Sequence, residues 1–134
     1  MSQESNVRVA HELYAAFGRG DIPAVIQGLD PEITWVNPGP GDYAYFGTHR
    51  GQDQVLKNVF MFLGENIDVE VMTPTDTLAS SDKVVVLLHM ECTAKKTGRK
   101  VVQEVAHVWT FKNGRPVHFH DFQDNAAIVT ALRG

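Results

Sequence analysis

The sequence KVVQEVAHVWTFKNGRPVHFHDF, residues 100–122, has the pattern of a β-hairpin. Apolar and aromatic residues alternate with polar ones on both sides of Asn113-Gly114, a dipeptide typical of tight turns between antiparallel strands. If Asn113-Gly114 alone formed the loop, Thr110 would share a face with Val117, and His107 with His120.

A three-residue loop, Lys112–Gly114 with glycine in the bulge position, gives a more coherent face, and we prefer it. The opposed pairs are then Phe111–Arg115, Trp109–Val117, His107–Phe119 and Val105–Asp121. One face of the hairpin collects the large apolar side chains with a few polar ones among them: Gln103, Val105, His107, Trp109, Phe111, Val117, Phe119, Asp121 and Gln123.

The periodicities in the rest of the chain place most helices before the strands. Helices are expected over residues 6–17, 22–29, 52–63 and 125–132, and strands over 33–36, 67–72, 83–93, 100–111 and 117–122. Asp21 and Asp124 are expected as N-caps, because a carboxylate there accepts free N–H groups of the first helical turn. This order predicts an α+β fold with helices packed on one face of a curved sheet.

The chain has 134 residues, of which 43% are hydrophobic and 21% charged, and this predicts one folded domain over residues 1–134. Its net charge of −4 argues against a nucleic-acid partner, because a nucleic-acid-binding surface is basic. The single cysteine, Cys92, excludes an internal disulfide and a multi-cysteine zinc site. No apolar run is long enough to cross a membrane, and the polar first residues lack a signal-peptide pattern, so we expect a cytoplasmic protein.

Asp121 is the residue on the hairpin's apolar face with the clearest chemical potential. A carboxylate on a helix-covered face loses hydration and becomes a better base near neutral pH. A bare buried charge would cost several kcal/mol, so Asp121 should have a partner or line a wet cavity. His107, on the neighbouring strand, is the expected partner.

Several pieces of the chain, in their order and spacing, resemble the SnoaL-like polyketide cyclases, a branch of the nuclear transport factor two-like superfamily. Limonene-epoxide hydrolase and ketosteroid isomerase belong to the same superfamily. The pieces are Gly20-Asp21-Ile22, Ile33–Pro38, Thr97-Gly98-Arg99, Phe111–Arg115 and His120–Asp124. The resemblance covers nearly the whole chain. It implies a cystatin-like cone roll, in which a cone-shaped, mostly antiparallel sheet is covered on its concave face by three helices from the N-terminal half, with a ligand cavity inside and frequent dimerisation.

The resemblance to the epoxide hydrolase is partial. Asp121 falls at the acid/base aspartate that the cyclases and this hydrolase share, and Asn37 at the hydrolase's water-positioning asparagine. Trp35 falls where the hydrolase has a tyrosine. The Arg and second Asp that the hydrolase needs fall at Leu88 and Met90, which argues against epoxide hydrolysis.

The resemblance to ketosteroid isomerase is weaker still at the catalytic positions. The isomerase's base, an Asp, falls at Asn37, which cannot take a proton. Its oxyanion tyrosine falls at Leu13, with Tyr14 one position away and about 100° round the helix. Its second oxyanion donor, a carboxylic acid, falls at His107. The resemblance therefore implies the cavity of this enzyme without its catalytic groups.

We expect a cofactor-independent isomerase- or cyclase-like proton transfer, alpha to a carbonyl, on a cyclic or polyketide-type compound. Asp121 would remove the proton, and His107 and Asn37 would donate hydrogen bonds to the developing enolate oxygen. The expected cavity wall is mostly apolar and aromatic: Tyr14, Trp35, Phe60, Met90, Val105, Trp109, Phe119 and Gln123.

The alternative is a non-catalytic module that binds a small molecule or serves dimerisation, with a hydrolase as a third possibility. An open pocket of at least about 300 Å³ that exposes Asp121 would favour ligand chemistry. A pocket filled by Trp35, Trp109 and Phe119 would favour the module.

The outer face of the sheet is expected to form a homodimer, as the resemblance implies. His118 and His120 share this face at a spacing that permits metal binding, but without a third ligand we expect no metal. On the middle strand, Met90 is expected to face the cavity, and His89 would replace it if the strand were displaced by one residue.

Overall fold

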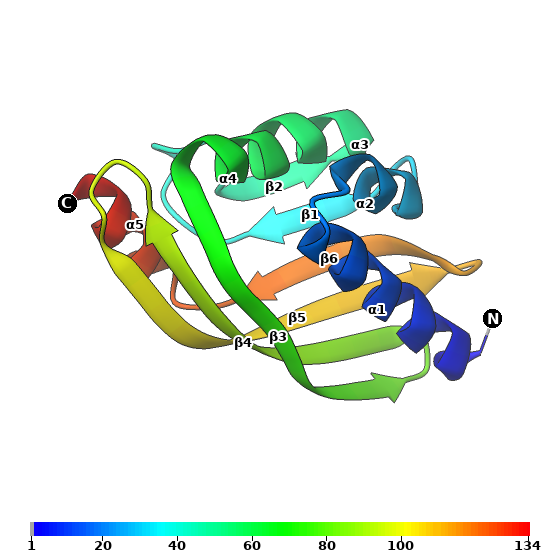
Figure 1. The fold of residues 1–134 in the computed structure, drawn as a ribbon. Coiled ribbons are helices and arrows are strands. Elements are labelled where there is room, and N and C mark those ends of the chain that lie inside the picture. Colours follow the sequence, from blue (N-terminus) through cyan, green and yellow to red (C-terminus); the bar gives the residue numbers. More distant parts are fainter. Residues whose placement is uncertain (1) are drawn as a thin grey trace.

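The computed structural model describes residues 2–134 and has one strongly curved sheet of six strands with helices on its concave side (Figure 1). The helices are α1 (Gln3–Gly18), α2 (Ile22–Gly28), α3 (Gly51–Gln54), the π-helical η1 (Val55–Phe60), α4 (Met61–Asn66) and α5 (Asn125–Arg133). The strands are β1 (Thr34–Asn37), β2 (Gly47–Arg50), β3 (Ile67–Ser80), β4 (Lys83–Ala94), β5 (Lys100–Lys112) and β6 (Arg115–Phe122). Their order in the sheet is β2-β1-β6-β5-β4-β3, and only the β1–β6 pair is parallel.

The helices cover the sheet as expected for the cone fold. In Figure 1, α1, α2 and the continuous α3–η1–α4 segment lie on the inner side of the sheet, and α5 closes the end opposite the N-terminus. Both predicted N-caps are confirmed: a side-chain oxygen of Asp21 accepts the N–H of Ala24, and that of Asp124 accepts the N–H of Ala127.

Two strands differ from the prediction. β2, over Gly47–Arg50, was not predicted, because four residues without alternation give no periodic signal and only pairing with β1 makes them a strand. β3 continues to Ser80 instead of ending at Met72. Its second half is mostly polar and exposed, which suits an edge strand. The pairing of β3 with β4 shifts register at Glu70, in the first half of the strand, and again at Thr75.

The β5–β6 hairpin has neither of the registers considered from the sequence. Asn113 and Gly114 form a two-residue turn with positive φ angles of 54° and 79°, so the preferred three-residue loop is wrong. One register shift follows at once, because Phe111 pairs with Pro116 but Thr110 pairs with His118, which leaves Val117 as an extra residue on β6.

The bulge sets the pairs that matter beyond the turn. Trp109 lies opposite Phe119, and His107 lies opposite Asp121 rather than opposite Phe119. The predicted inward face still holds for the large residues, since Val105, His107, Trp109, Phe111, Phe119 and Asp121 are all buried. Val117, the bulge residue, is only half-buried.

Candidate functional site

A cavity lies between the concave face of the sheet and the helices α1, α2, η1 and α4, and Ile128 of α5 also lines it. Its volume is about 80 Å³, and all empty space at the site, open solvent included, measures about 760 Å³. Among residues 2–134, the lining is apolar or aromatic except for a few polar side chains and contains no Lys or Arg. The polar side chains, apart from the two indoles, are Tyr14, Asn37, Tyr45, Cys92, His107, Asp121 and Gln123.

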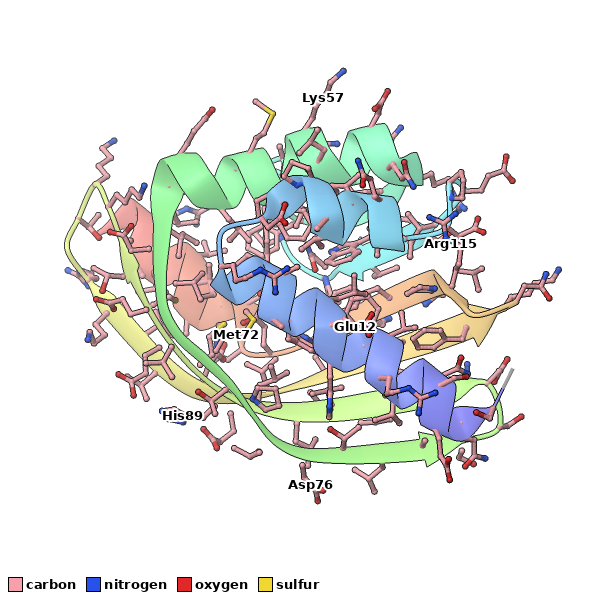
Figure 2. All side chains as sticks on the ribbon, turned by 45° about the vertical axis from the view of Figure 1, so that its right-hand side comes forward. Glu12, Lys57, Met72, Asp76, His89 and Arg115 are labelled. Carbon is pink, nitrogen blue, oxygen red and sulfur yellow. The ribbon has the colours of Figure 1, made fainter. Side chains whose placement is uncertain are left out.

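Nearly all of the residues predicted for the site line this cavity. Asp121, His107 and Asn37 do so, together with Tyr14, Trp35, Phe60, Met90, Trp109, Phe119 and Gln123. Val105 is the exception, because it is buried in the core without being one of the lining residues that the structure describes. On β4 it is Met90 that faces the cavity, while His89 lies on the outer side of the sheet (Figure 2).

Aromatic rings form the floor of the cavity. Trp35 stacks on Phe119 with 3.9 Å between ring centroids, because β1 and β6 place these two residues opposite one another. Trp109 lies 4.6 Å from Phe119 and nearly perpendicular to Trp35. Leu88 and Met90, the positions of the hydrolase's charged pair, are both buried and apolar.

Asp121 is the only carboxylate among the described lining residues, and it is 2% exposed. The next inward residue of the chain, Gln123, donates its side-chain N–H to Asp121 Oδ2. Asp121 Oδ1 makes no hydrogen bond with any described residue, but it lies 3.3 Å from Nε2 of His107, its partner across the β5–β6 ladder. The predicted neighbourhood of Asp121 and His107 is therefore present.

His107 joins Asp121 to the one hydroxyl of α1 that lines the cavity. Its Nδ1 lies 2.7 Å from the hydroxyl of Tyr14, which also accepts the indole N–H of Trp109 at 2.9 Å. Because Trp109 can only donate, the proton of Tyr14 is free to point at His107 or at a ligand. Burial raises the pKa of Tyr14 well above its ordinary value, so this hydroxyl stays a proton donor at neutral pH.

Tyr14 has a larger part in the site than the resemblance implied. Leu13 and Tyr14 both line the cavity, so the step of about 100° between neighbouring helical residues does not carry Tyr14 out of it. The contact between Tyr14 and His107 joins residues 93 positions apart, so no local pattern could have predicted it.

A second cluster of buried polar groups includes Asn37, at the end of β1. The side-chain N–H of Asn37 donates to the backbone carbonyl of Tyr45 at 3.0 Å, which leaves its other N–H free. His49 donates to the same carbonyl and accepts from Asn58, which holds the loop before β2 in place. Tyr45 was missed as a site residue because this loop has no periodic signal; it lines the cavity, and burial raises its pKa well above the ordinary value.

Several lining residues on α1, the η1–α4 segment and β3 are partly exposed, and we infer from this that the cavity opens on their side. The lining residues here keep part of their surface in solvent and are apolar apart from Tyr14: Phe17, Phe60, Leu63, Val69 and Met72. Figure 2 shows Met72 on the inner side of β3, next to α1. A compound entering the cavity must therefore cross an apolar rim before it meets Asp121.

The outer face of the sheet carries a separate set of side chains. His89 lies between Glu91 and Glu104, at 2.9 and 2.5 Å, and these two carboxylates raise the pKa of His89. Within residues 2–134 no three His, Cys, Asp or Glu side chains are grouped to hold a metal ion. None of the helices in this range is both long and apolar enough to span a membrane.

The chain has relatives along nearly its whole length. The family model for the SnoaL-like domain matches residues 10–119. An NTF2-like protein from Burkholderia pseudomallei is 32% identical with a TM-score of 0.89, and each chain covers 100% of the other. TerC, co-crystallised with polyporic acid, is 25% identical with a TM-score of 0.86, covering 97% of this chain and 99% of its own. An uncharacterized protein of Mycobacterium tuberculosis strain H37Rv is 28% identical over 132 residues, or 98% of both chains.

Proposed function

Because the chain belongs to the SnoaL-like domain family, we propose that it binds a neutral, cyclic or aromatic carbonyl compound in its cavity and transfers a proton on it. The reaction is isomerase- or cyclase-like and uses Asp121 as the base. One observation carries this proposal: a lone carboxylate, buried in an apolar cavity, is linked through His107 to the hydroxyl of Tyr14.

The proton transfer needs no co-reactant. Asp121 Oδ1 takes the proton from the carbon next to the carbonyl; the electron pair of the broken C–H bond forms the C=C bond of the enolate, and the π pair of the carbonyl moves to its oxygen. Asp121 then returns the proton to another carbon, which isomerises the compound. In the cyclase variant, the enolate carbon instead attacks a second carbonyl of the same molecule and closes a ring, and Asp121 returns its proton to the alkoxide oxygen that this attack forms.

Hydrogen-bond donors near the cavity floor stabilise the enolate oxygen in this proposal. The free N–H of Asn37 is one donor, as expected from the sequence. The hydroxyl of Tyr14 is the other. Both ring nitrogens of His107 already face protein groups, so we propose that His107 orients Asp121 and Tyr14 instead of donating to the ligand itself.

The charge of the lining supports an uncharged substrate. Asp121 faces the cavity, and no Lys or Arg among the described residues lines it to compensate a ligand's carboxylate or phosphate. An anionic ligand would lose its hydration and be repelled by Asp121, with neutral hydrogen-bond donors but no cation to compensate its charge. Neutral ketones, esters and phenols are the compounds that this lining accommodates.

A second candidate function, a non-catalytic module, is favoured by the size of the cavity. The cavity volume of about 80 Å³ is below the roughly 300 Å³ typical of small-molecule sites. The stacked pair of Trp35 and Phe119 occupies much of the floor. A two-ring compound is therefore a better first probe than a larger polyketide.

We also propose that the chain forms a homodimer through the outer face of the sheet. Large apolar side chains on adjacent strands are exposed there, with 37% exposure for Leu87, 56% for Val102 and 52% for Phe122. Apolar side chains grouped on one face in this way are typical of protein–protein interfaces. A second copy of the same face would cover them.

The proposed chemistry can be tested with 2-tetralone, a neutral two-ring ketone with an acidic proton beside its carbonyl. We expect the protein to speed deuterium exchange at this position in D₂O, measured by NMR. The variant Asp121→Asn should lose this activity, while binding of the phenol 2-naphthol, followed by the fluorescence of the two tryptophans, remains. Asp76→Asn is the matched control, because Asp76 lies outside the cavity (Figure 2). Binding without exchange in the native protein would favour the module, and exchange that survives in Asp121→Asn would exclude Asp121 as the base.

A further inference from the structure

A chain of hydrogen bonds runs from the backbone at the start of α5 to Asp121. The backbone N–H of Asp124 donates to Gln103 Oε1 at 2.9 Å, and Gln103 Nε2 donates to Gln123 Oε1 at 3.0 Å. Gln123 Nε2 in turn donates to Asp121 Oδ2. Gln103 is half-buried and is not one of the described residues that line the cavity.

The direction of every bond in this chain follows from its first member. A backbone N–H can only donate, so the oxygen of the Gln103 amide must face Asp124 and its nitrogen must face Gln123. The Gln123 amide must then present its oxygen to Gln103 and its nitrogen to Asp121. Neither amide can be turned over without placing two donors or two acceptors against each other.

Asp124 is available for this purpose because of its place in α5. Its side chain caps the helix by accepting the N–H of Ala127. Its own backbone N–H precedes the helix and has no partner there, which leaves it free to bind Gln103. Asp124 therefore both caps α5 and begins this series of hydrogen bonds.

The consequence is that the two oxygens of Asp121 differ. Oδ2 accepts an N–H from Gln123, whereas Oδ1 makes no hydrogen bond with any described residue and has the His107 ring 3.3 Å away. We propose that Gln103 is a positioning residue, which holds the Gln123 amide so that Oδ2 stays occupied and Oδ1 is the atom that accepts the substrate's proton. The catalytic part of this inference rests on the proposed function; the direction of the hydrogen-bond chain does not.

Two variants of similar size separate the polarity of Gln103 from its packing. In Gln103→Glu, one carboxylate oxygen still accepts the backbone N–H of Asp124, but the other oxygen now faces the side-chain oxygen of Gln123. To avoid placing two acceptors together, the Gln123 amide must turn over, which directs its oxygen at Asp121. In Gln103→Met, the hydrogen bonds to Asp124 and to Gln123 are both lost. Gln27→Glu, on the exposed surface of α2, controls for the added charge.

We expect kcat for 2-tetralone exchange to fall at least about tenfold in Gln103→Glu, because the bond lost is one to a charged group, with KM unchanged. Binding of 2-naphthol should be unchanged, because Gln103 does not line the cavity. A native kcat in Gln103→Glu would overturn the positioning role.

NMR of the side-chain amides tests the hydrogen-bond chain independently of any activity. In the native protein, the Gln103 and Gln123 amide protons should exchange with water more slowly than those of exposed Gln27, and Gln103→Met should accelerate exchange at Gln123. Exchange at Gln123 as fast as at Gln27 in the native protein would overturn the inference. If the native protein fails to exchange 2-tetralone while Gln123 is protected, the proposed function fails and the hydrogen-bond chain stands.

Discussion

Replacing Tyr14 by phenylalanine removes one hydroxyl and leaves two buried groups without a partner. Trp109 Nε1 loses its acceptor at 2.9 Å, and His107 Nδ1 loses its partner at 2.7 Å, while the ring of residue 14 keeps its packing. Each buried polar group left unpaired costs about 1–3 kcal/mol, and water from the neighbouring cavity can replace part of what is lost. We expect Tyr14→Phe to lower the free energy of unfolding by about 2–4 kcal/mol.

Urea unfolding followed by tryptophan fluorescence measures this loss. With a denaturant slope of about 2 kcal/mol/M, the midpoint should fall by about 1–2 M. Tyr43→Phe is the matched control, because the Tyr43 hydroxyl makes no hydrogen bond with another described residue; its stability should stay within about 0.5 kcal/mol of the native value. Equal midpoints for Tyr14→Phe and Tyr43→Phe would refute the hydrogen-bonded link between Trp109, Tyr14 and His107.

Other consequences of the structure can be checked with single variants. Gly114→Val should lower the melting temperature clearly, because Gly114 has a φ of 79° that a β-branched residue adopts only with strain; an unchanged melting temperature would contradict the turn. Asp124→Ala should cost about 1 kcal/mol of stability in thermal unfolding through loss of the N-cap, yet keep the exchange activity, because the backbone N–H that binds Gln103 remains. Sedimentation should give a dimer for the native chain and a monomer for Phe122→Asp, since Phe122 is 52% exposed on the outer sheet face; a native monomer at high concentration would exclude this interface.

Local signals predicted most of the fold. The helices and the long strands follow from apolar spacing, and the carboxylates of Asp21 and Asp124 mark helix starts by a mechanism that acts within one turn. β2 and the polar half of β3 were missed, because pairing with a neighbouring strand, and not their own pattern, makes them strands. The bulge at Val117 was missed for a similar reason, since its place depends on how two whole strands pair.

The members of the candidate site were easier to predict than their contacts. Alternation along β5 puts His107 on the inner face, but Asp121 shares that face only in the preferred register or through the bulge at Val117, because a plain two-residue turn would pair His107 with His120. The partners of these residues come from distant parts of the chain: Tyr14 from α1 and Asp124 from the start of α5. Such contacts depend on the packing of helices against the sheet, for which a single sequence has no local signal.

A crystal structure with 2-naphthol bound tests the central claim most directly. Carbon 1 of this phenol corresponds to the acidic carbon of 2-tetralone, and its oxygen corresponds to the enolate oxygen. We expect carbon 1 in contact with Asp121 Oδ1 and the naphthol oxygen within hydrogen-bond distance of Tyr14 or Asn37. A naphthol bound only at the outer face of the sheet, or one whose oxygen rather than carbon 1 meets Asp121 Oδ1, would contradict it.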